Sequence, residues 1–373
     1  MIAGRVAKAL GAKRVTIKVG SALLVENGQA RRHWLDSLAD DIARLIAGGQ
    51  RVIVVTSGAI ALGRPALGLR RRALRLEEKQ AAAAAGQILL ARAWQESLAR
   101  HDLATAQLLV TPGDTEDRRR YLNARATMET LLRMGAVPVV NENDTVATSE
   151  IRFGDNDRLG ARVAVMASSE TLVLLSDVDG LYTDNPATHA DAVHVPVVET
   201  ITPEIEAMAG ESLSGVGSGG MVSKIAAARI ATRAGTTVLL ARGTETNPVE
   251  RLIGGGRCTV FEAQVTPRRA RKDWIGASLA VAGSLTIDDG AAGALARGSS
   301  LLPAGVVCVE GDFERGDAII VLTRDGRQLA KGLSAYDVAD ARQIAGCRTA
   351  EIEAKLGWRG RDEMIHRDDL VLL

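Results

Sequence analysis

Two lysines lie beside glycines that allow the backbone to approach an anion. Lys18 belongs to an apolar run that ends at Gly20 and Ser21, and Lys224 closes a glycine-bearing loop before a predicted helix. Backbone N–H groups of such loops bind anions, and each lysine adds a positive charge. A turn with a solvated lysine is the alternative for either loop alone. Together they suit a transferring phosphoryl group, whose transition state spreads negative charge over its oxygens.

Acidic and amide side chains gather in two nearby segments. The first is Asn141-Glu142-Asn143-Asp144, and the second is Gly154-Asp155-Asn156-Asp157, which precedes a predicted helix. One residue of the second segment is expected to cap that helix. The two segments together contain more carboxylates and amides than a cap requires. We therefore predict acceptors that orient lysines, hold Mg²⁺ or bind an α-amino group.

Several other catalytic patterns are missing from the sequence. It contains no GxxxxGK[ST] motif, which excludes a P-loop nucleotide site. Gly215, Gly217 and Gly220 match GxGxxG, but the preceding segment is polar and no acidic residue follows at the expected distance, which disfavours NAD binding. The five histidines form no HExxH motif and the three cysteines form no CxxC motif, which argues against zinc or a disulfide scaffold.

Short β-branched runs alternate with longer amphipathic segments between residue 14 and about residue 242, a pattern typical of βαβ units. The predicted strands cover 15–19, 51–55, 104–110, 137–140, 171–175 and 237–240. The predicted helices cover 34–46, 77–100, 118–134, 158–167 and 222–234. The strands are almost wholly apolar, which indicates an open, mostly parallel sheet with helices on both faces. The alanine run at 81–85 predicts a tightly packed helix.

Small, polar or charged residues follow the predicted strands at their carboxyl ends. Gly20-Ser21 follows the first strand, Thr56-Ser57-Gly58 the second, the 141–144 segment the fourth and Ser176-Asp177 the fifth. Ligands of open α/β sheets bind beyond these ends. The convergence of four such segments predicts a functional site along this edge of the sheet.

The length of 373 residues predicts two domains. A glycine triplet at 254–256, Pro267 and a basic run at 268–272 indicate a boundary, and shorter strand-like segments follow. We predict an α/β domain over 1–260, a linker over 261–276 and a small, mostly β domain over 277–373.

The charge balance is close to neutral, with 46 Lys plus Arg against 45 Asp plus Glu. This disfavours a polybasic protein that binds nucleic acid or membrane surfaces. The residues before Trp274 have a net charge of +5, from 35 basic and 30 acidic side chains, whereas the remainder has −4, from 11 and 15. No uncharged run is long enough to span a bilayer. The sequence predicts a soluble, cytoplasmic protein without a membrane segment.

As a set, these motifs resemble the glutamate 5-kinases, amino acid kinases that carry a C-terminal PUA domain. The resemblance covers essentially the whole chain. The segments that carry it are Lys18-Val19-Gly20-Ser21, Val55-Thr56-Ser57-Gly58-Ala59, Asn141-Glu142-Asn143-Asp144, Gly154-Asp155-Asn156-Asp157, Leu175-Ser176-Asp177, Gly180-Leu181-Tyr182-Thr183, and Gly219-Gly220-Met221 with Lys224.

The resemblance implies transfer of the γ-phosphoryl group of ATP, with Mg²⁺, to the side-chain carboxylate of L-glutamate. The product would be L-glutamyl 5-phosphate, formed in the first step of L-proline biosynthesis. Lys18 and Lys224 would stabilise the phosphoryl group, with Asp157 orienting both lysines. The residues implied to bind glutamate are Ser57, Asp144 and Asn156. Those implied to bind the nucleotide are Lys18, Ser176, Asp177, Ser218, Gly219, Gly220, Met221, Val222, Ser223 and Lys224.

Other properties are implied by the resemblance or remain open. It implies a homo-oligomer, either a dimer or a tetramer, and feedback inhibition by L-proline. The Mg²⁺ ligands stay open among Asp144, Asp157, Asp177 and the ATP phosphates. The acidic tail argues against RNA binding by the PUA-like domain, because RNA affinity rests mainly on neutralising phosphates. The alternatives are a related kinase acting on aspartate, acetylglutamate, carbamate or UMP, and an RNA-binding or RNA-modifying protein.

Overall fold

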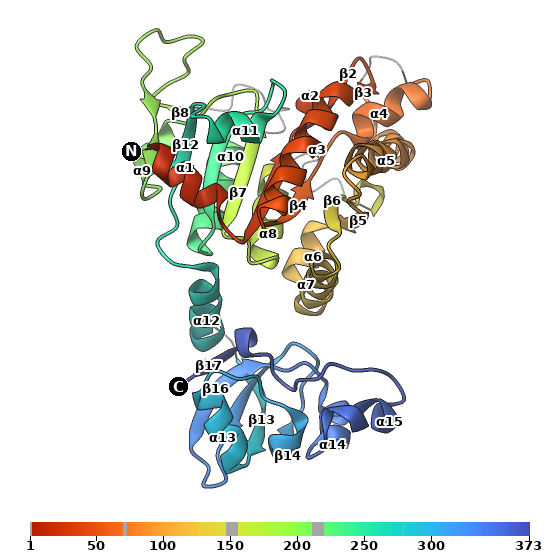
Figure 1. Ribbon diagram of the computed structural model, residues 1–373, viewed down its shortest axis with the longest axis vertical. Helices are drawn as coiled ribbons and strands as arrows, with labels where there is room; N and C mark the ends of the chain where they lie inside the picture. The colour runs from red at the N-terminus through yellow and green to blue at the C-terminus, as the bar shows by residue number, and fades with distance from the viewer. Residues whose placement is uncertain (1, 70–72, 147–155, 211–219, 279) are drawn as a thin grey trace. The chain divides into compact units, whose positions relative to one another are not determined.

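The computed structural model describes residues 2–69, 73–146, 156–210, 220–278 and 280–373. The chain forms two compact units, Met1–Pro267 and Arg268–Leu373. Figure 1 labels the helices and strands of each unit. Among the described residues, none of the helices has both the length and the apolar character that a membrane span requires.

An eight-stranded sheet forms the centre of the first unit, in the order β10-β12-β11-β7-β1-β4-β6-β5. Its strands are β1 (Arg14–Val19), β4 (Arg51–Val55), β5 (Thr105–Val110), β6 (Val137–Glu142), β7 (Thr171–Ser176), β10 (Val197–Val198), β11 (Thr237–Arg242) and β12 (Cys258–Phe261). All neighbours are parallel except β11 and β12. Every residue of β6 and β7 is buried, which confirms the prediction of a mostly parallel sheet covered on both faces.

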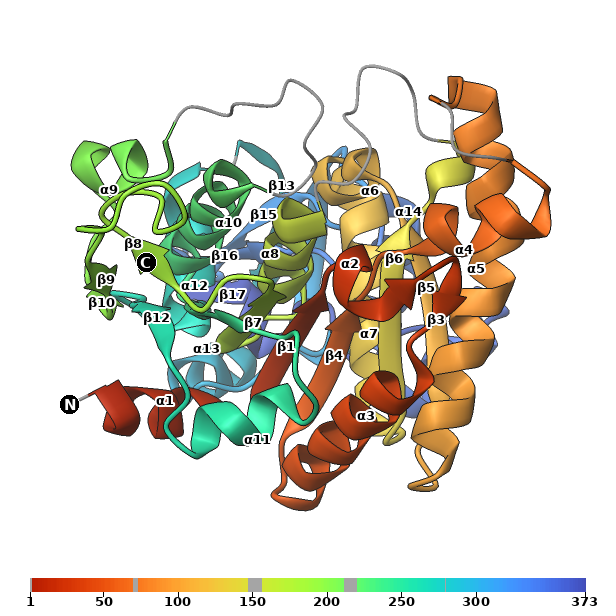
Figure 2. The ribbon, with the colours of Figure 1, turned by 90° about the horizontal axis from the view of Figure 1, so that it is seen from above.

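Helices cover both faces of this sheet, as Figure 2 shows. Alternate residues of β1 and β7 pack on opposite faces, because successive side chains of a strand point to opposite sides. One face carries α1 (Ile2–Leu10), α3 (Arg32–Ala47), α5 (Leu76–Ala99) and α11 (Pro248–Ile253). The other carries α7 (Arg118–Arg133), α8 (Asn156–Met166) and α10 (Met221–Arg233). Each of the five predicted helices is present, with its ends within two residues of the prediction.

Shorter elements connect these layers. The helices among them are α2 (Ser21–Leu24), α4 (Ala59–Ala66), α6 (Pro112–Glu116), α9 (Pro203–Ala207) and the 3-10 turn η1 (Asp144–Val146). The strands are β2 (Val25–Glu26) paired with β3 (Gln29–Ala30), and β8 (Leu181–Tyr182) paired with β9 (His194–Val195). Of these, α2 follows β1, α4 follows β4 and η1 follows β6, at the carboxyl edge of the sheet.

Helices α4 and α5 approach each other at backbone distance. A Cβ atom at Gly63 would lie 1.8 Å from the carbonyl oxygen of Ala82, and one at Gly86 would lie 1.7 Å from that of Ala59. Only glycine fits either position, because any side chain there would overlap the facing backbone. This contact confirms the tight packing predicted from the alanine run. It also holds Gln87, the next residue of α5, beside the sheet.

The second unit is built on a five-stranded sheet, ordered β14-β13-β15-β16-β17. Its elements are α12 (Pro267–Ser278), β13 (Val281–Ile287), α13 (Asp289–Ala296), η2 (Pro303–Gly305), β14 (Val306–Gly311), β15 (Ala318–Leu322), β16 (Gln328–Leu333), α14 (Val338–Ile344), η3 (Thr349–Glu351), α15 (Ile352–Leu356), η4 (Arg367–Asp369) and β17 (Leu370–Leu372). Its buried core includes Leu285, Ile319, Tyr336, Ile344 and Ile365. The structure thus confirms a small domain built mostly of strands.

Helix α12 occupies part of the segment that the sequence predicts as a linker. Its Arg271 lies 2.7 Å from Asp369, with both side chains almost fully buried. The ammonium group of Lys331 donates to the carbonyl oxygen of Gly276 at 3.2 Å. These bonds join the helix to β16 and η4, so residues 268–276 pack as part of the second unit.

Candidate functional site

The predicted segments meet at the carboxyl edge of the large sheet because the central strands are parallel and in register. Lys18 pairs with Val55 on one side and with Leu174 on the other, and Val55 pairs in turn with Val140. The residues that follow these strands therefore emerge side by side. This register confirms that β1, β4, β6 and β7 deliver their polar ends to one edge (Figure 2).

Two lysines and one aspartate form the centre of this edge. The Nζ atom of Lys18, on β1, lies 2.5 Å from Oδ1 of Asp157, on α8. The Nζ atom of Lys224, on α10, donates to Oδ2 of the same carboxylate at 3.2 Å. The side chains of Lys18, Asp157 and Lys224 are 8%, 1% and 7% exposed. We call these three residues the lysine pair with Asp157.

Local sequence makes room for this arrangement. Asp157 lies in the first turn of α8, and Gly160 follows one turn later on the same helix. A Cβ atom at Gly160 would lie 3.1 Å from Cγ of Lys18, so the glycine leaves space for the lysine stem. The helix can therefore approach β1 closely enough for Asp157 to reach Lys18.

The electrostatics of the lysine pair with Asp157 favour an anion. Burial alone would raise the pKa of Asp157, but the two lysines outweigh it and lower that pKa. The carboxylate is therefore ionised. Two ammonium groups next to a single carboxylate concentrate positive charge at a poorly hydrated position, which suits a negatively charged ligand.

A second group at the edge consists of amides. Asn156 is 5% exposed, and its Nδ2 atom donates to the carbonyl oxygen of Thr56 at 2.9 Å and to Oδ1 of Asn141 at 3.5 Å. Among the described residues, its Oδ1 atom has no hydrogen-bond partner. Asn156 thus bonds to residues that follow β4 and belong to β6, whereas Asp157 bonds to the two lysines. Asp155, which belongs to the segment predicted to supply the cap of this helix, lies outside the described residues.

The remaining residues predicted to bind glutamate lie at the ends of β4 and β6. The hydroxyl of Ser57 donates to the carbonyl oxygen of Val19 at 3.0 Å, which joins the ends of β4 and β1. Asp144 begins η1 just after β6, and burial raises its pKa to about 6. A carboxylate in this position gains from a nearby positive charge, such as an ammonium group.

The segments predicted to bind the nucleotide lie beyond β7 and before α10. The hydroxyl of Ser176 donates to Oδ1 of Asp177 at 2.9 Å, and the Gly243 N–H donates to the carbonyl oxygen of Ser176 at 2.7 Å. Gly220 caps α10, so Met221, Val222 and Ser223 form its first turn. Ser218 and Gly219 lie outside the described residues.

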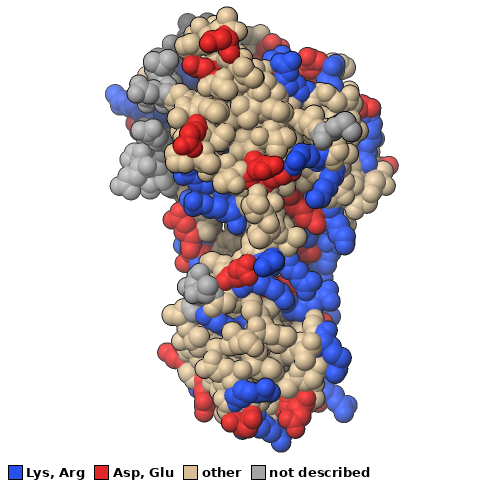
Figure 3. Space-filling view, turned by 90° about the vertical axis from the view of Figure 1, so that its left-hand side faces the viewer, with Lys and Arg blue, Asp and Glu red and all other residues tan. Residues whose placement is uncertain are grey.

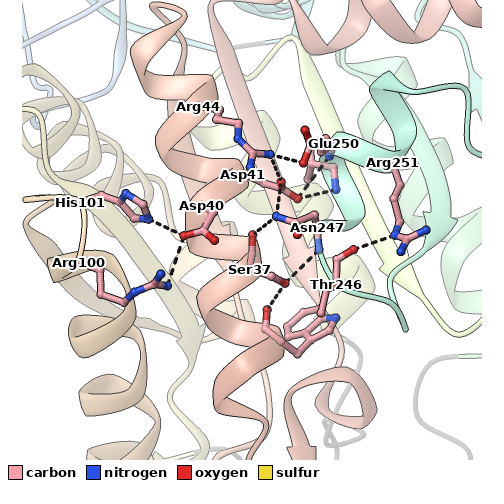
Figure 4. Close-up of polar contacts among 12 residues, drawn as sticks. Ser37, Asp40, Asp41, Arg44, Arg100, His101, Thr246, Asn247, Glu250 and Arg251 are labelled. Carbon is pink, nitrogen blue, oxygen red and sulfur yellow. Dashed lines mark hydrogen bonds and ion pairs between the residues drawn. The ribbon is translucent and has the colours of Figure 1, made fainter.

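A polar network holds the loop after β11 against α3 (Figure 4). The indole N–H of Trp34 donates to the carbonyl oxygens of Gly243 and Glu245, at 2.7 and 2.9 Å. Asp41 accepts from the Val249 N–H at 2.9 Å and from Nδ2 of Asn247 at 3.2 Å. The network thus anchors the loop whose first residue bonds to Ser176.

Sequence reasoning did not identify the residues of this network, nor Gln87, which bonds to Asn141. Trp34 and Asp41 occur in an ordinary amphipathic helix, and Gln87 follows an alanine run. No local motif distinguishes them. Their contacts depend on residues between 54 and 211 positions away along the chain.

Comparison with known proteins identifies two families along the chain. The amino acid kinase family model matches residues 3–242, and the PUA domain model matches residues 283–356. Glutamate 5-kinase 1 of Mesorhizobium japonicum is 59% identical over 361 residues, which cover 96% of each protein. Glutamate 5-kinase of Paramagnetospirillum magneticum is 58% identical over 97% of this chain and 98% of that protein. That of Brucella ovis is 56% identical over 96% of each. This chain therefore belongs to the amino acid kinase family and, within it, to the glutamate 5-kinases.

Proposed function

We propose that this protein transfers the γ-phosphoryl group of ATP to the side-chain carboxylate of L-glutamate. The products are L-glutamyl 5-phosphate and ADP, and the reaction is the first step of L-proline biosynthesis. The relatives named glutamate 5-kinase match the chain over nearly its whole length. The observation that carries the chemistry is the lysine pair with Asp157, which concentrates positive charge at the carboxyl edge of the sheet.

The reaction needs charge neutralisation and positioning more than proton transfer. The glutamate side chain is ionised at neutral pH, so its oxygen attacks the γ-phosphorus without a general base. Lys18 and Lys224 stabilise the negative charge on the transferring group. Asp157 holds both ammonium groups in place and keeps the two positive charges together before ATP binds.

Other side chains at the edge bind the two substrates. Ser57, Asp144 and Asn156 hold glutamate, and the raised pKa of Asp144 fits a carboxylate that gains an ammonium partner when the substrate binds. Ser176 and Asp177 contact ATP. The loop before α10 contributes the rest of the nucleotide contacts: Ser218, Gly219, Gly220, Met221, Val222, Ser223 and Lys224.

Mg²⁺ fits this site as an ion held mainly by the ATP phosphates. Asp157 faces two lysines, so it is not a suitable metal ligand, whereas Asp144 and Asp177 can each offer a carboxylate oxygen. Within the described ranges, no three Asp, Glu, His or Cys side chains cluster as a metal cage. Mg²⁺ usually combines one or two carboxylates with substrate phosphates. When bound, it would neutralise phosphate charge.

An ADP-release assay with a panel of acceptors tests the function directly. We expect ATP- and Mg²⁺-dependent release of ADP with L-glutamate, and much less with aspartate, acetylglutamate, carbamate or UMP. Activity with aspartate but not with glutamate would contradict the substrate. No ADP release with any acceptor would contradict the kinase assignment.

The proposal extends to domain organisation and assembly. We place the kinase domain at residues 1–260 and the PUA-like domain at 277–373; of the segment 261–276 between them, residues 268–276 pack with the second unit. Following the family resemblance, we propose a cytoplasmic dimer or tetramer that is inhibited by L-proline.

We also propose that the PUA-like domain does not act through RNA. Residues 268–373, which include α12, contain 15 basic and 16 acidic side chains, a net charge of −1. On the face in Figure 3, most of the second unit's surface is uncharged, with basic and acidic side chains both at its margins. A mobility-shift assay of the whole protein with structured RNA at low salt tests this. Tight, salt-dependent binding would contradict it.

A further inference from the structure

A chain of three side-chain amides runs from α5 to the end of β4. Oε1 of Gln87 accepts from Nδ2 of Asn141 at 2.7 Å, and Oδ1 of Asn141 faces Nδ2 of Asn156 at 3.5 Å. Nδ2 of Asn156 also donates to the carbonyl oxygen of Thr56 at 2.9 Å. The chain therefore links a helix on one face of the sheet to Asn156, one of the residues predicted to bind glutamate.

The direction of this chain follows from its last member. A backbone carbonyl can only accept, so the nitrogen of the Asn156 amide must face Thr56, and its oxygen must point elsewhere. The nitrogen of Asn156 also faces Asn141 and needs an acceptor there. The oxygen of the Asn141 amide therefore faces Asn156, and its nitrogen faces Gln87. Gln87 completes the chain by accepting from that nitrogen.

The chain leaves one acceptor unused. Oδ1 of Asn156 is buried and has no partner among the described residues. A buried amide oxygen without a donor is energetically unfavourable, so such an atom is expected to gain a donor in the functional state. In L-glutamate at neutral pH both carboxylates only accept, and the α-ammonium group supplies the only N–H donors.

We infer that Gln87 is a positioning residue for the amino group of glutamate, acting through Asn141 to keep Oδ1 of Asn156 available for that group. This inference rests on the proposed function. Without Gln87, the Asn141 amide is free to turn and to present its nitrogen, in place of its oxygen, to the nitrogen of Asn156. That turn would remove one of the two acceptors that fix the Asn156 amide, so its oxygen would no longer be held available for the substrate. The backbone contact of α5 with α4 at Gly86 holds Gln87 in place for this role.

The variant Gln87→Met tests the inference, because it keeps the side-chain length and removes the acceptor. We expect KM for glutamate to rise about tenfold, as for the loss of a hydrogen bond to a charged group, with kcat and KM for ATP unchanged. The inhibition constant of glutarate, which lacks the amino group, should stay unchanged. Gln87→Glu retains an acceptor and should keep KM near the wild-type value. Gln95→Met makes the same change at an exposed position of α5 and should have no effect.

Two results would overturn the inference. One is an unchanged KM for glutamate in Gln87→Met. The other is an equal loss of glutamate and glutarate binding, which indicates a general structural role. If Gln87→Met does not fold, Gln87→Lys replaces the acceptor with a donor, and the same rise in KM is expected. Failure of the wild-type protein to phosphorylate glutamate would instead contradict the proposed function, whatever these variants do.

Discussion

Two buried aspartates in the first unit have almost the same exposure and opposite electrostatics. Asp41 on α3 is 2% exposed and Asp157 on α8 is 1% exposed. Burial raises the pKa of Asp41, although hydrogen bonds from Asn247, Val249 and Glu250 oppose the rise. Burial acts in the same direction on Asp157, but the adjacent lysines lower its pKa overall. Burial by itself therefore does not distinguish a structural carboxylate from a functional one.

The partners of each carboxylate make the distinction. Asp41 accepts from backbone N–H groups at the start of α11 and from Asn247, so it joins two elements of the fold (Figure 4). Asp157 is bound by two flexible ammonium groups from different elements, and next to it Asn156 has an acceptor without a described partner. Two lysines around one carboxylate, together with an acceptor that has no partner among the described residues, indicate a place that a ligand completes. We therefore expect substitutions in the lysine pair with Asp157 to affect catalysis, and substitutions around Asp41 to affect stability.

The largest effect is expected on catalysis, from Lys224→Ala. Removal of one lysine leaves the transferring phosphoryl group less stabilised, so kcat should fall by at least ~10². Asp157 keeps Lys18 at 2.5 Å, so the fold should survive. Steady-state kinetics together with thermal unfolding check both statements. An unchanged kcat would remove Lys224 from the mechanism.

A smaller effect, on stability alone, is expected from Asp41→Ala. The substitution leaves buried donors of α11 and Asn247 unpaired, which should lower the free energy of unfolding by about 1–3 kcal/mol. Denaturant unfolding measures this change, and kcat should stay near the wild-type value. The matched control is Asp40→Ala, because Asp40 pairs with Arg100 and His101 at the partly exposed surface of the same helix. Such pairs contribute about 0–1 kcal/mol. If Asp41→Ala lost as much activity as Lys224→Ala, the proposed difference between Asp41 and the lysine pair with Asp157 would be wrong.

The smallest effect is expected on kcat/KM for glutamate when the pH is lowered. The pKa of Asp144 is raised to about 6, so the carboxylate loses its charge as the pH falls through that value. The protonated form no longer attracts the α-ammonium group of glutamate, so kcat/KM for glutamate should be about tenfold lower at pH 5 than on its plateau. Asp144→Asn should lower the plateau and abolish the step near pH 6. A profile that is flat through pH 6 in the wild-type protein would contradict this role.

The sequence predicts the sheet and its main helices well because their signals are local. The buried parallel strands are almost continuous runs of Val, Ile and Leu, and Gly48, Asp117 and Gly220 mark ends of α3, α7 and α10. β6 continues through Glu142, two residues beyond its predicted end, because Asn141 and Glu142 pair with β5 although they are polar. The glycine triplet, Pro267 and the basic run predict a linker over 261–276, whereas Pro267–Ser278 form helix α12 and Arg271 is bonded to Asp369, 98 residues away.

The residues of the candidate site also fall into two groups, those that the sequence predicts and those that it does not. Lys18, Lys224 and Asp157 each occur in a short motif that is recognisable in the sequence. Gln87 and Asp41 do not, because their roles arise only when distant elements pack against them.

The sequence by itself determined which residue types follow each strand and where strand-like apolar runs alternate with amphipathic helical segments, since both are local properties of the chain. Only the tertiary structure decided the distances at which the two lysines approach Asp157, and that a row of amides ends on the carbonyl of Thr56. It also decided which of two equally buried aspartates is enclosed by backbone donors and which by lysines. These properties depend on distances of a few ångströms between residues far apart in the chain, and helix packing on the sheet sets those distances.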